Sequence, residues 1–194
     1  MVVPADRQRL DRYRLPAAYS PGAPLPQQFL WFCLGAPLLA ARWLPGSAWR
    51  CNLLRLFGSQ IGAGCRLKPG LRVKYPWRLQ VGSHCWLGED VWIDNLAPVV
   101  IGEQVCLSQG VYLCTGNHNY RSAGFELRCG AIQVGDGAWI AAQARIAPGV
   151  QVGADAVLGL GSVALSHIPA SAVMQGNPAQ FVRWRWPAAS AAEH

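Results

Sequence analysis

The sequence is poor in charge, and most of the charge that it has is arginine. Charged residues make up 14% of the 194-residue chain, and only Lys68 and Lys74 of its 17 basic residues are lysines. This composition, with 52% hydrophobic residues, excludes an extended, charged disordered chain. The longest apolar run, at 29–41, is shorter than the roughly 20 residues that a membrane-spanning helix requires. We therefore expect one folded domain with its own core.

Sequence patterns of metal and disulfide frameworks are missing as well. The seven cysteines are scattered, odd in number and form no CxxC pair, which favours reduced thiols in a cytoplasmic protein. The four histidines do not have the spacing of a histidine zinc site. We therefore expect neither a structural nor a catalytic metal.

The net charge of +7 favours an anionic partner. Arginine recognises phosphate through its bidentate fork, but the arginines form no dense run, so nucleic acid is disfavoured. Residues 29–57 mix three arginines with three tryptophans, a composition that suits the headgroup zone of a membrane. This segment predicts either peripheral contact with the inner face of a membrane or a cover for one end of the core.

A six-residue repeat dominates the chain from Ile61 onward. Aliphatic residues recur every six positions in stretches that begin at Ile61, Val81, Ile101, Val134 and Val152, and all 14 marked positions are Val, Ile or Leu. This period fits neither a helix nor an ordinary strand and indicates a short strand followed by a corner. Three such units close a triangular coil, and stacked coils bury the aliphatic column. The repeat therefore predicts an all-β solenoid, the hexapeptide parallel β-helix.

The segments around the repeat are irregular. Residues 1–60 form an N-terminal extension that we expect to be partly helical, with Ser47 capping a short helix that stops at Gly58. The β-helix spans 61–165, and a loop at about 115–132 interrupts it. Residues 166–194 predict turns, a short terminal segment and a tail that is disordered from Pro187.

Several motifs accompany the repeat. The loop holds His118 and an Arg-x-x-Gly-x-Glu motif at 121–126, Trp139-Ile140 follows it, and Gly-Asn-Pro-Ala stands at 176–179. Together with the triangular stack of coils, which we call the prism, these motifs resemble the hexapeptide O-acetyltransferases that include maltose and galactoside acetyltransferases. Residues 74–79, 94–96 and 113–116 resemble the colanic acid biosynthesis acetyltransferases most closely, and the resemblance runs from about residue 28 to 185.

This resemblance implies a left-handed β-helix, a homotrimer with sites between subunits, and acetyl-CoA as cosubstrate with no metal needed for catalysis. It also implies transfer of acetyl to a hydroxyl of a sugar or exopolysaccharide precursor. Two alternatives stay open: a non-catalytic trimeric scaffold or sugar-binding prism, and an amino-sugar N-acyltransferase.

The resemblance also implies roles for particular side chains. Acetylation of a hydroxyl needs a base, and the family's catalytic histidine matches His118, whose alternative is an exposed ring on a turn. Glu126 matches a glutamate that orients the imidazole or holds a hydroxyl, and otherwise it is a solvated loop charge. Asp94 and Asn95 resemble the acceptor-binding residues, although a corner asparagine can be purely structural.

The cofactor site is implied in the same way. The family lays acetyl-CoA between neighbouring prisms, and the matching residues are Trp139, Ala141, Ala142, Ser162 and Arg183. Trp139 is otherwise an aromatic that covers a sheet edge. Relatives usually have basic residues where this chain has Ser166 and Gln180, a departure that puts the phosphate contacts in doubt and motivates the scaffold alternative.

Overall fold

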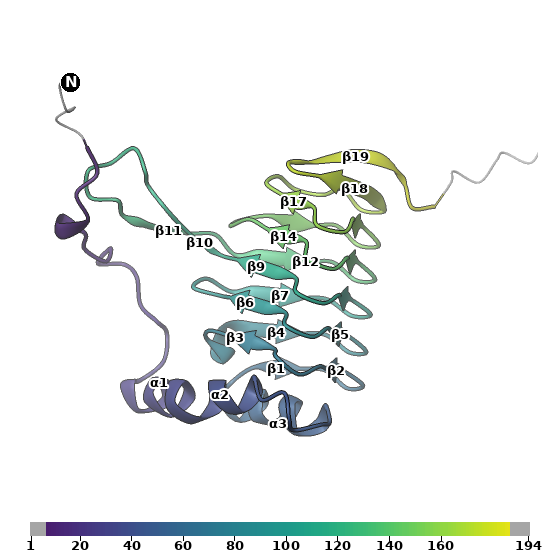
Figure 1. Cartoon of the computed structure of the whole chain (residues 1–194), viewed down its shortest axis with the longest axis horizontal. Coiled ribbons are helices and arrows are strands. Elements are labelled where there is room, and N and C mark those ends of the chain that lie inside the picture. Colours follow the sequence, from purple (N-terminus) through teal and green to yellow (C-terminus); the bar gives the residue numbers. More distant parts are fainter. Residues whose placement is uncertain (1–6, 187–194) are drawn as a thin grey trace, which may run out of the picture.

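A computed structural model describes residues 7–186, and its centre is a three-sided stack of short parallel strands (Figure 1). Sheet A has the order β1 (Gln60–Ile61), β4 (Leu79–Val81), β7 (Val99–Ile101), β12 (Ile132–Val134), β15 (Gln151–Val152). Sheet B runs from β2 (Arg66–Leu67) through β5 (Trp86–Leu87), β8 (Cys106–Leu107), β13 (Trp139–Ile140) and β16 (Val157–Leu158). Sheet C has the order β3 (Arg72–Val73), β6 (Trp92–Asp94), β9 (Tyr112–Cys114), β14 (Arg145–Ile146), β17 (Val163–Ala164).

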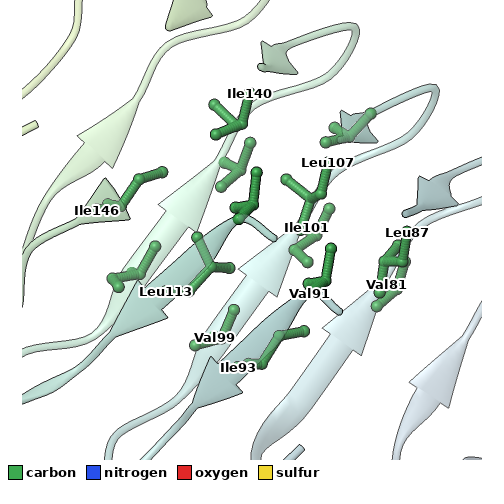
Figure 2. Packing of buried hydrophobic residues seen from close by; sticks show 14 of the residues in the cluster. Val81, Leu87, Val91, Ile93, Val99, Ile101, Leu107, Leu113, Ile140 and Ile146 are labelled. Carbon is green, nitrogen blue, oxygen red and sulfur yellow. The ribbon is translucent and has the colours of Figure 1, made fainter. Parts of the chain in front are cut away.

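The register of the strands is the one that the repeat predicts. In sheet A, Ile61 pairs with Val81, Val81 with Ile101, Ile101 with Val134, and Val134 with Val152. All 14 aliphatic repeat positions are buried. Figure 2 shows part of this column, in which Ile101, Leu107 and Leu113 from the three sheets point into the prism. The predicted fold class, a left-handed parallel β-helix, is confirmed.

Glycine follows many of the repeat positions because the coils leave no room at that corner. A Cβ at Gly62 would lie 2.5 Å from the backbone nitrogen of Ser83, and one at Gly82 would lie 2.7 Å from that of Glu103. Real Cβ atoms essentially never come so close to backbone. The glycines thus allow neighbouring coils to stack at the normal strand spacing.

Helices cover the N-terminal end of the stack. A continuous helical segment comprises α1 (Leu25–Leu30), the π-helical turn η2 (Trp31–Gly35) and α2 (Ala36–Leu39), and α3 (Ala48–Leu56) follows it. Short 3-10 turns, η1 (Leu10–Arg12) and η3 (Pro76–Arg78), lie before and after this region. Trp31 is fully buried, donates from Nε1 to the carbonyl of Lys74 at 3.0 Å and packs on the Phe57 ring. No helix within 7–186 is long and apolar enough to cross a membrane.

The position of α3 agrees with the prediction, but the chemistry of its cap does not. Ser47 stands at the N-cap, yet its hydroxyl does not bond to the first turn of the helix. Instead it donates to the carbonyl of Leu67 and accepts from the Leu67 N–H, both at 3.2 Å. The hydroxyl therefore ties the helix to the first coil.

A hairpin closes the other end of the stack. β18 (Ala172–Gly176) extends sheet B beside β16, and β19 (Ala179–Trp184) returns antiparallel to it. Figure 1 shows this hairpin at the opposite end from α1–α3. At this end, the edge of sheet B is therefore the antiparallel strand β19. The tail predicted to be disordered from Pro187 lies outside the described residues.

Candidate active site

A hairpin carries His118 away from the stack. After β9, the chain forms β10 (Gly116–His118) and β11 (Leu127–Cys129), which pair antiparallel before the chain re-enters the prism at β12. Buried Thr115 fixes the root, because its hydroxyl donates to the carbonyl of Asp94 at 2.9 Å and accepts from the N–H of Ala97 at 3.0 Å. The loop predicted at this position is therefore an ordered hairpin at the corner between sheets C and A.

The imidazole of His118 is held by the opposite side of this hairpin. Its Nδ1 lies 2.8 Å from the carbonyl oxygen of Phe125. A carbonyl can only accept, so Nδ1 carries the proton and Nε2 of the neutral ring keeps its lone pair. The Phe125 ring lies flat against the imidazole, with centroids 4.3 Å apart and planes 2° apart. The backbone and side chain of one residue thus set both the tautomer and the plane of His118.

Phe125 has a left-handed backbone, with φ of 48°. This conformation is unfavourable for a bulky residue, and such residues persist where their surroundings demand them. Here the conformation accompanies a carbonyl directed at Nδ1 and a ring stacked on His118. Sequence reasoning missed Phe125, because a contact made by a backbone carbonyl has no residue-type signature.

The N-terminal arm reaches the same hairpin. The backbone N–H of Arg9 donates to the carbonyl of Ala123 at 2.9 Å, and the Tyr13 ring meets the His118 ring edge-on with centroids 5.8 Å apart. Residues more than 100 positions apart in the sequence therefore share one surface. The arm carries no motif that predicts this contact.

Glu126 accepts hydrogen bonds from two side chains of the hairpin loop. The hydroxyl of Ser122 donates to its Oε1 at 2.7 Å, and Asn119 Nδ2 lies 3.5 Å from its Oε2. The Ser122 hydrogen bond is the main reason that the pKa of Glu126 is lowered. Two functional roles are predicted for Glu126. The carbonyl of Phe125, not Glu126, bonds to the imidazole and orients it. Contact of Glu126 with an acceptor hydroxyl stays a prediction.

An open hollow of ≈ 460 Å³ lies along the hairpin beside His118. Arg121 and Arg128 line it with positive charge, and Tyr120 adds an aromatic ring. Aromatic faces and charged hydrogen-bond donors suit a polar, hydroxyl-rich or anionic molecule. The hollow thus offers space for an acceptor next to the imidazole.

The side chains of Asp94 and Asn95 have different surroundings. Asn95 is fully buried, where its Oδ1 accepts from the N–H of Tyr75 at 2.9 Å and its Nδ2 donates to the Tyr75 carbonyl at 2.7 Å. This geometry is that of a structural asparagine whose side chain is closed off from solvent, and the predicted contact with an acceptor stays a prediction. Asp94 points away from the prism core but is largely covered, with its carboxylate 3.1 Å from Lys74 Nζ and 3.2 Å from the hydroxyl of Tyr112. Burial is the main cause that raises the pKa of Tyr112, so it stays a neutral phenol.

The predicted cofactor residues gather on another part of the prism. Trp139 is half-exposed on β13 and donates from Nε1 to the hydroxyl of Ser108 at 2.9 Å, and Ala141 and Ala142 form the corner that follows it. Ser162 is buried, and its hydroxyl accepts from the N–H of Gly176 at 3.0 Å. Arg183 is exposed on β19, on the same sheet as Trp139.

These residues and His118 lie at different corners of one chain. The cofactor residues lie on sheet B and its corner toward sheet C, whereas the hairpin leaves between sheets C and A. Figure 1 shows the hairpin projecting from the opposite side of the stack to β2 and β5. Within residues 7–186, no three His, Cys, Asp or Glu side chains are placed to hold a metal.

The chain is similar to known proteins with hexapeptide repeats, although no protein-family profile matches it. Over 180 residues it is 36% identical to WcaF of Escherichia coli K12, a protein named for colanic acid biosynthesis acetyltransferase activity, and the match covers 92% of this chain and 97% of that protein. A hexapeptide-repeat acetyltransferase from Vibrio cholerae, solved with acetyl-CoA, matches 79% of this chain and 86% of its own with a TM-score of 0.71 and 25% identity. A maltose O-acetyltransferase from Clostridium difficile matches 82% and 87% with a TM-score of 0.71, and its 23% identity shows a shared fold.

Proposed function

Because the chain belongs to the hexapeptide-repeat acetyltransferases, we propose that it moves acetyl from acetyl-CoA to a hydroxyl of a sugar or exopolysaccharide precursor, with His118 as the general base. The observation that carries the proposal is the hydrogen bond from His118 Nδ1 to the carbonyl of Phe125 at 2.8 Å. It leaves Nε2 as the proton acceptor on a ring whose orientation is fixed.

In the proposed reaction, the acceptor hydroxyl gives its proton to Nε2 of His118 as its oxygen attacks the thioester carbonyl. The resulting imidazolium is stabilised because Nδ1–H already donates to Phe125. When the tetrahedral intermediate collapses, the carbon–sulfur bond breaks and the thiolate of CoA recovers the proton from Nε2. The acetyl group moves directly, without a covalent acyl-enzyme, and such a base contributes about 10²- to 10⁴-fold.

We also propose that the enzyme is a homotrimer whose sites lie between chains. The separation of the two groups within one chain supports this arrangement, because His118 and the residues around Trp139 stand at different corners. Three prisms with parallel axes bring the hairpin of one chain to sheet B of its neighbour. In this arrangement Arg183 contacts the phosphates of CoA. Ser166 and Gln180 are exposed but carry no charge with which to bind phosphate.

The test of the base is the variant His118→Gln, which keeps a polar side chain without a basic nitrogen. Thiol release from acetyl-CoA is measured with a panel of sugars and lipid-linked precursors as acceptors. We expect kcat to fall about 10²- to 10⁴-fold, while the CoA-induced rise in Tm and the trimer mass stay unchanged. His84→Asn is the matched control, since His84 has φ of 60° and asparagine accepts that conformation.

The outcomes separate the competing functions. Turnover of His118→Gln equal to wild type would remove histidine from the mechanism. No change of Tm at millimolar CoA would favour a non-catalytic scaffold, since a ligand that binds the native state must stabilise it. Products that survive hydroxylamine would be amides and would identify an amino-sugar N-acyltransferase, because hydroxylamine cleaves the ester expected here.

A further inference from the structure

The helical segment 25–39 exposes an apolar surface on the side away from the stack. Its inner side is formed by Trp31, Gly35 and Leu39, which are buried. Its outward residues are all apolar, and with exposed Trp43 they make up what we term the cap surface: Leu25, Pro26, Phe29, Leu30, Phe32, Cys33, Leu34, Pro37 and Leu38. Leu25 is 79% exposed, Phe29 67% and Trp43 79%. Soluble proteins rarely leave a large contiguous apolar patch in water.

The cap surface contains no charged or polar side chain from the helical segment. The sequence has no charged residue between Arg14 and Arg42. The polar residues of the segment, Gln27 and Gln28, face inward and donate to the carbonyls of Phe57 and Ala23. A surface helix normally presents charges to solvent, so the composition of this one is typical of a helix with an apolar partner.

The stretch of sequence that contains the cap surface is strongly basic. No acidic residue occurs between Asp11 and Glu89, whereas that stretch contains ten lysines and arginines. Some of them serve the fold, such as buried Arg50, which donates to backbone carbonyls between the helices. Others are exposed on the first coil beside α3, including Arg66, Lys68 and Arg72.

From these observations we propose that the cap surface binds an anionic lipid membrane, with the helical segment lying in the plane of the interface. An apolar helix face inserts at the acyl boundary, and the surrounding Lys and Arg side chains attract anionic headgroups. Exposed Trp43 supplies an aromatic ring that suits the interface, whereas the neighbouring Arg42 is paired with Asp90.

Two features favour lipid over a second copy of this chain. Face-to-face pairing of two cap surfaces would bring two cationic surroundings together, which disfavours such a contact. Figure 1 shows α1–α3 across the end of the stack, so prisms packed side by side leave this end uncovered. A trimer of that kind would present three cap surfaces in one direction and bind with the gain of multivalency.

The test uses the full-length protein and sedimentation with vesicles. Vesicles of phosphatidylcholine alone are compared with vesicles that contain one quarter phosphatidylglycerol. We expect the protein to bind the anionic vesicles and to bind them more weakly as salt is added. Lys68→Glu changes the charge by two units, and we expect binding to weaken about fivefold for each of them. The double variant Phe29→Glu with Leu34→Glu changes the charge by the same amount but also removes apolar contacts, so it should bind at least tenfold more weakly than Lys68→Glu.

A basic protein can also adhere to anionic vesicles by any face, so the variant needs a control of equal charge. Leu160→Glu with Leu165→Glu changes the same number of charges at two exposed leucines of the opposite end, 70% and 61% exposed. Equal loss of binding in both double variants would overturn the proposal. So would the failure of wild type to sediment, or self-association that only the cap variant abolishes, which would assign the surface to a second copy. Unchanged Tm in both variants confirms that they fold.

Discussion

Replacing Asn95 with alanine tests the structural role that its burial assigns to it. Within residues 7–186, Asn95 Oδ1 is the partner of the Tyr75 N–H. Without it, a buried donor is unpaired, which costs about 1–3 kcal/mol. The Tyr75 carbonyl loses less, because it still accepts from the N–H of Arg78 at 3.0 Å, and one lost hydrogen bond contributes about 1 kcal/mol. We expect the free energy of unfolding to fall by roughly 2–4 kcal/mol.

The assay is urea unfolding of wild type and Asn95→Ala at equal protein concentration, because the stability of an oligomer depends on concentration. Asn52→Ala is the control: Asn52 is exposed and bonds to Arg55, so its loss should change the free energy of unfolding by no more than about 0.5 kcal/mol. A variant Asn95→Ala that unfolds like wild type but has a raised KM for the acceptor would refute the structural assignment and restore the acceptor contact.

Three further results are expected. Leu107→Ala, in the middle of the aliphatic column, should lower the free energy of unfolding by about 2–5 kcal/mol in the same urea assay; a loss below 1 kcal/mol would show that the column is loosely packed. Burial raises the pKa of the Cys85 thiol to about 11, so iodoacetamide at pH 8 should label exposed Cys33 and spare Cys85, as read by peptide mass. The pKa of Glu126 is lowered by the Ser122 hydroxyl, so its contribution to hairpin stability is complete above its ordinary pKa of 4.5 and is lost as pH falls through the lower folded value; protection factors of the hairpin amides, corrected for the pH dependence of intrinsic exchange, that stay constant down to pH 3 would contradict this.

The repeat could be predicted from the sequence because its signal is local and periodic. Each aliphatic position repeats the environment of the one a coil below, so Ile61 and Val81 identify the same place in the stack. The register, the direction of the strands and the position of the protruding loop all follow from that period.

The surroundings of His118 could not be predicted in the same way. Tyr13 meets the imidazole across more than 100 residues of sequence, and the contribution of Phe125 is a carbonyl that every residue possesses. Asn95 shows the converse, since a motif suggests an acceptor contact while the fold uses the amide to bind backbone. Residue type suggested His118 as the base, but only packing shows what orients its ring.

The stacking of coils also sets a height. Successive coils are one strand spacing apart, about 4.8 Å. The hairpin leaves the third coil, so its root stands two spacings, about 10 Å, above the coil that the helices cover. An inserted coil of 20 residues before Val81 would raise the hairpin that carries His118 by one spacing and leave its own contacts intact. The number of coils thus sets, in fixed increments, the distance between His118 and the helical end of the stack.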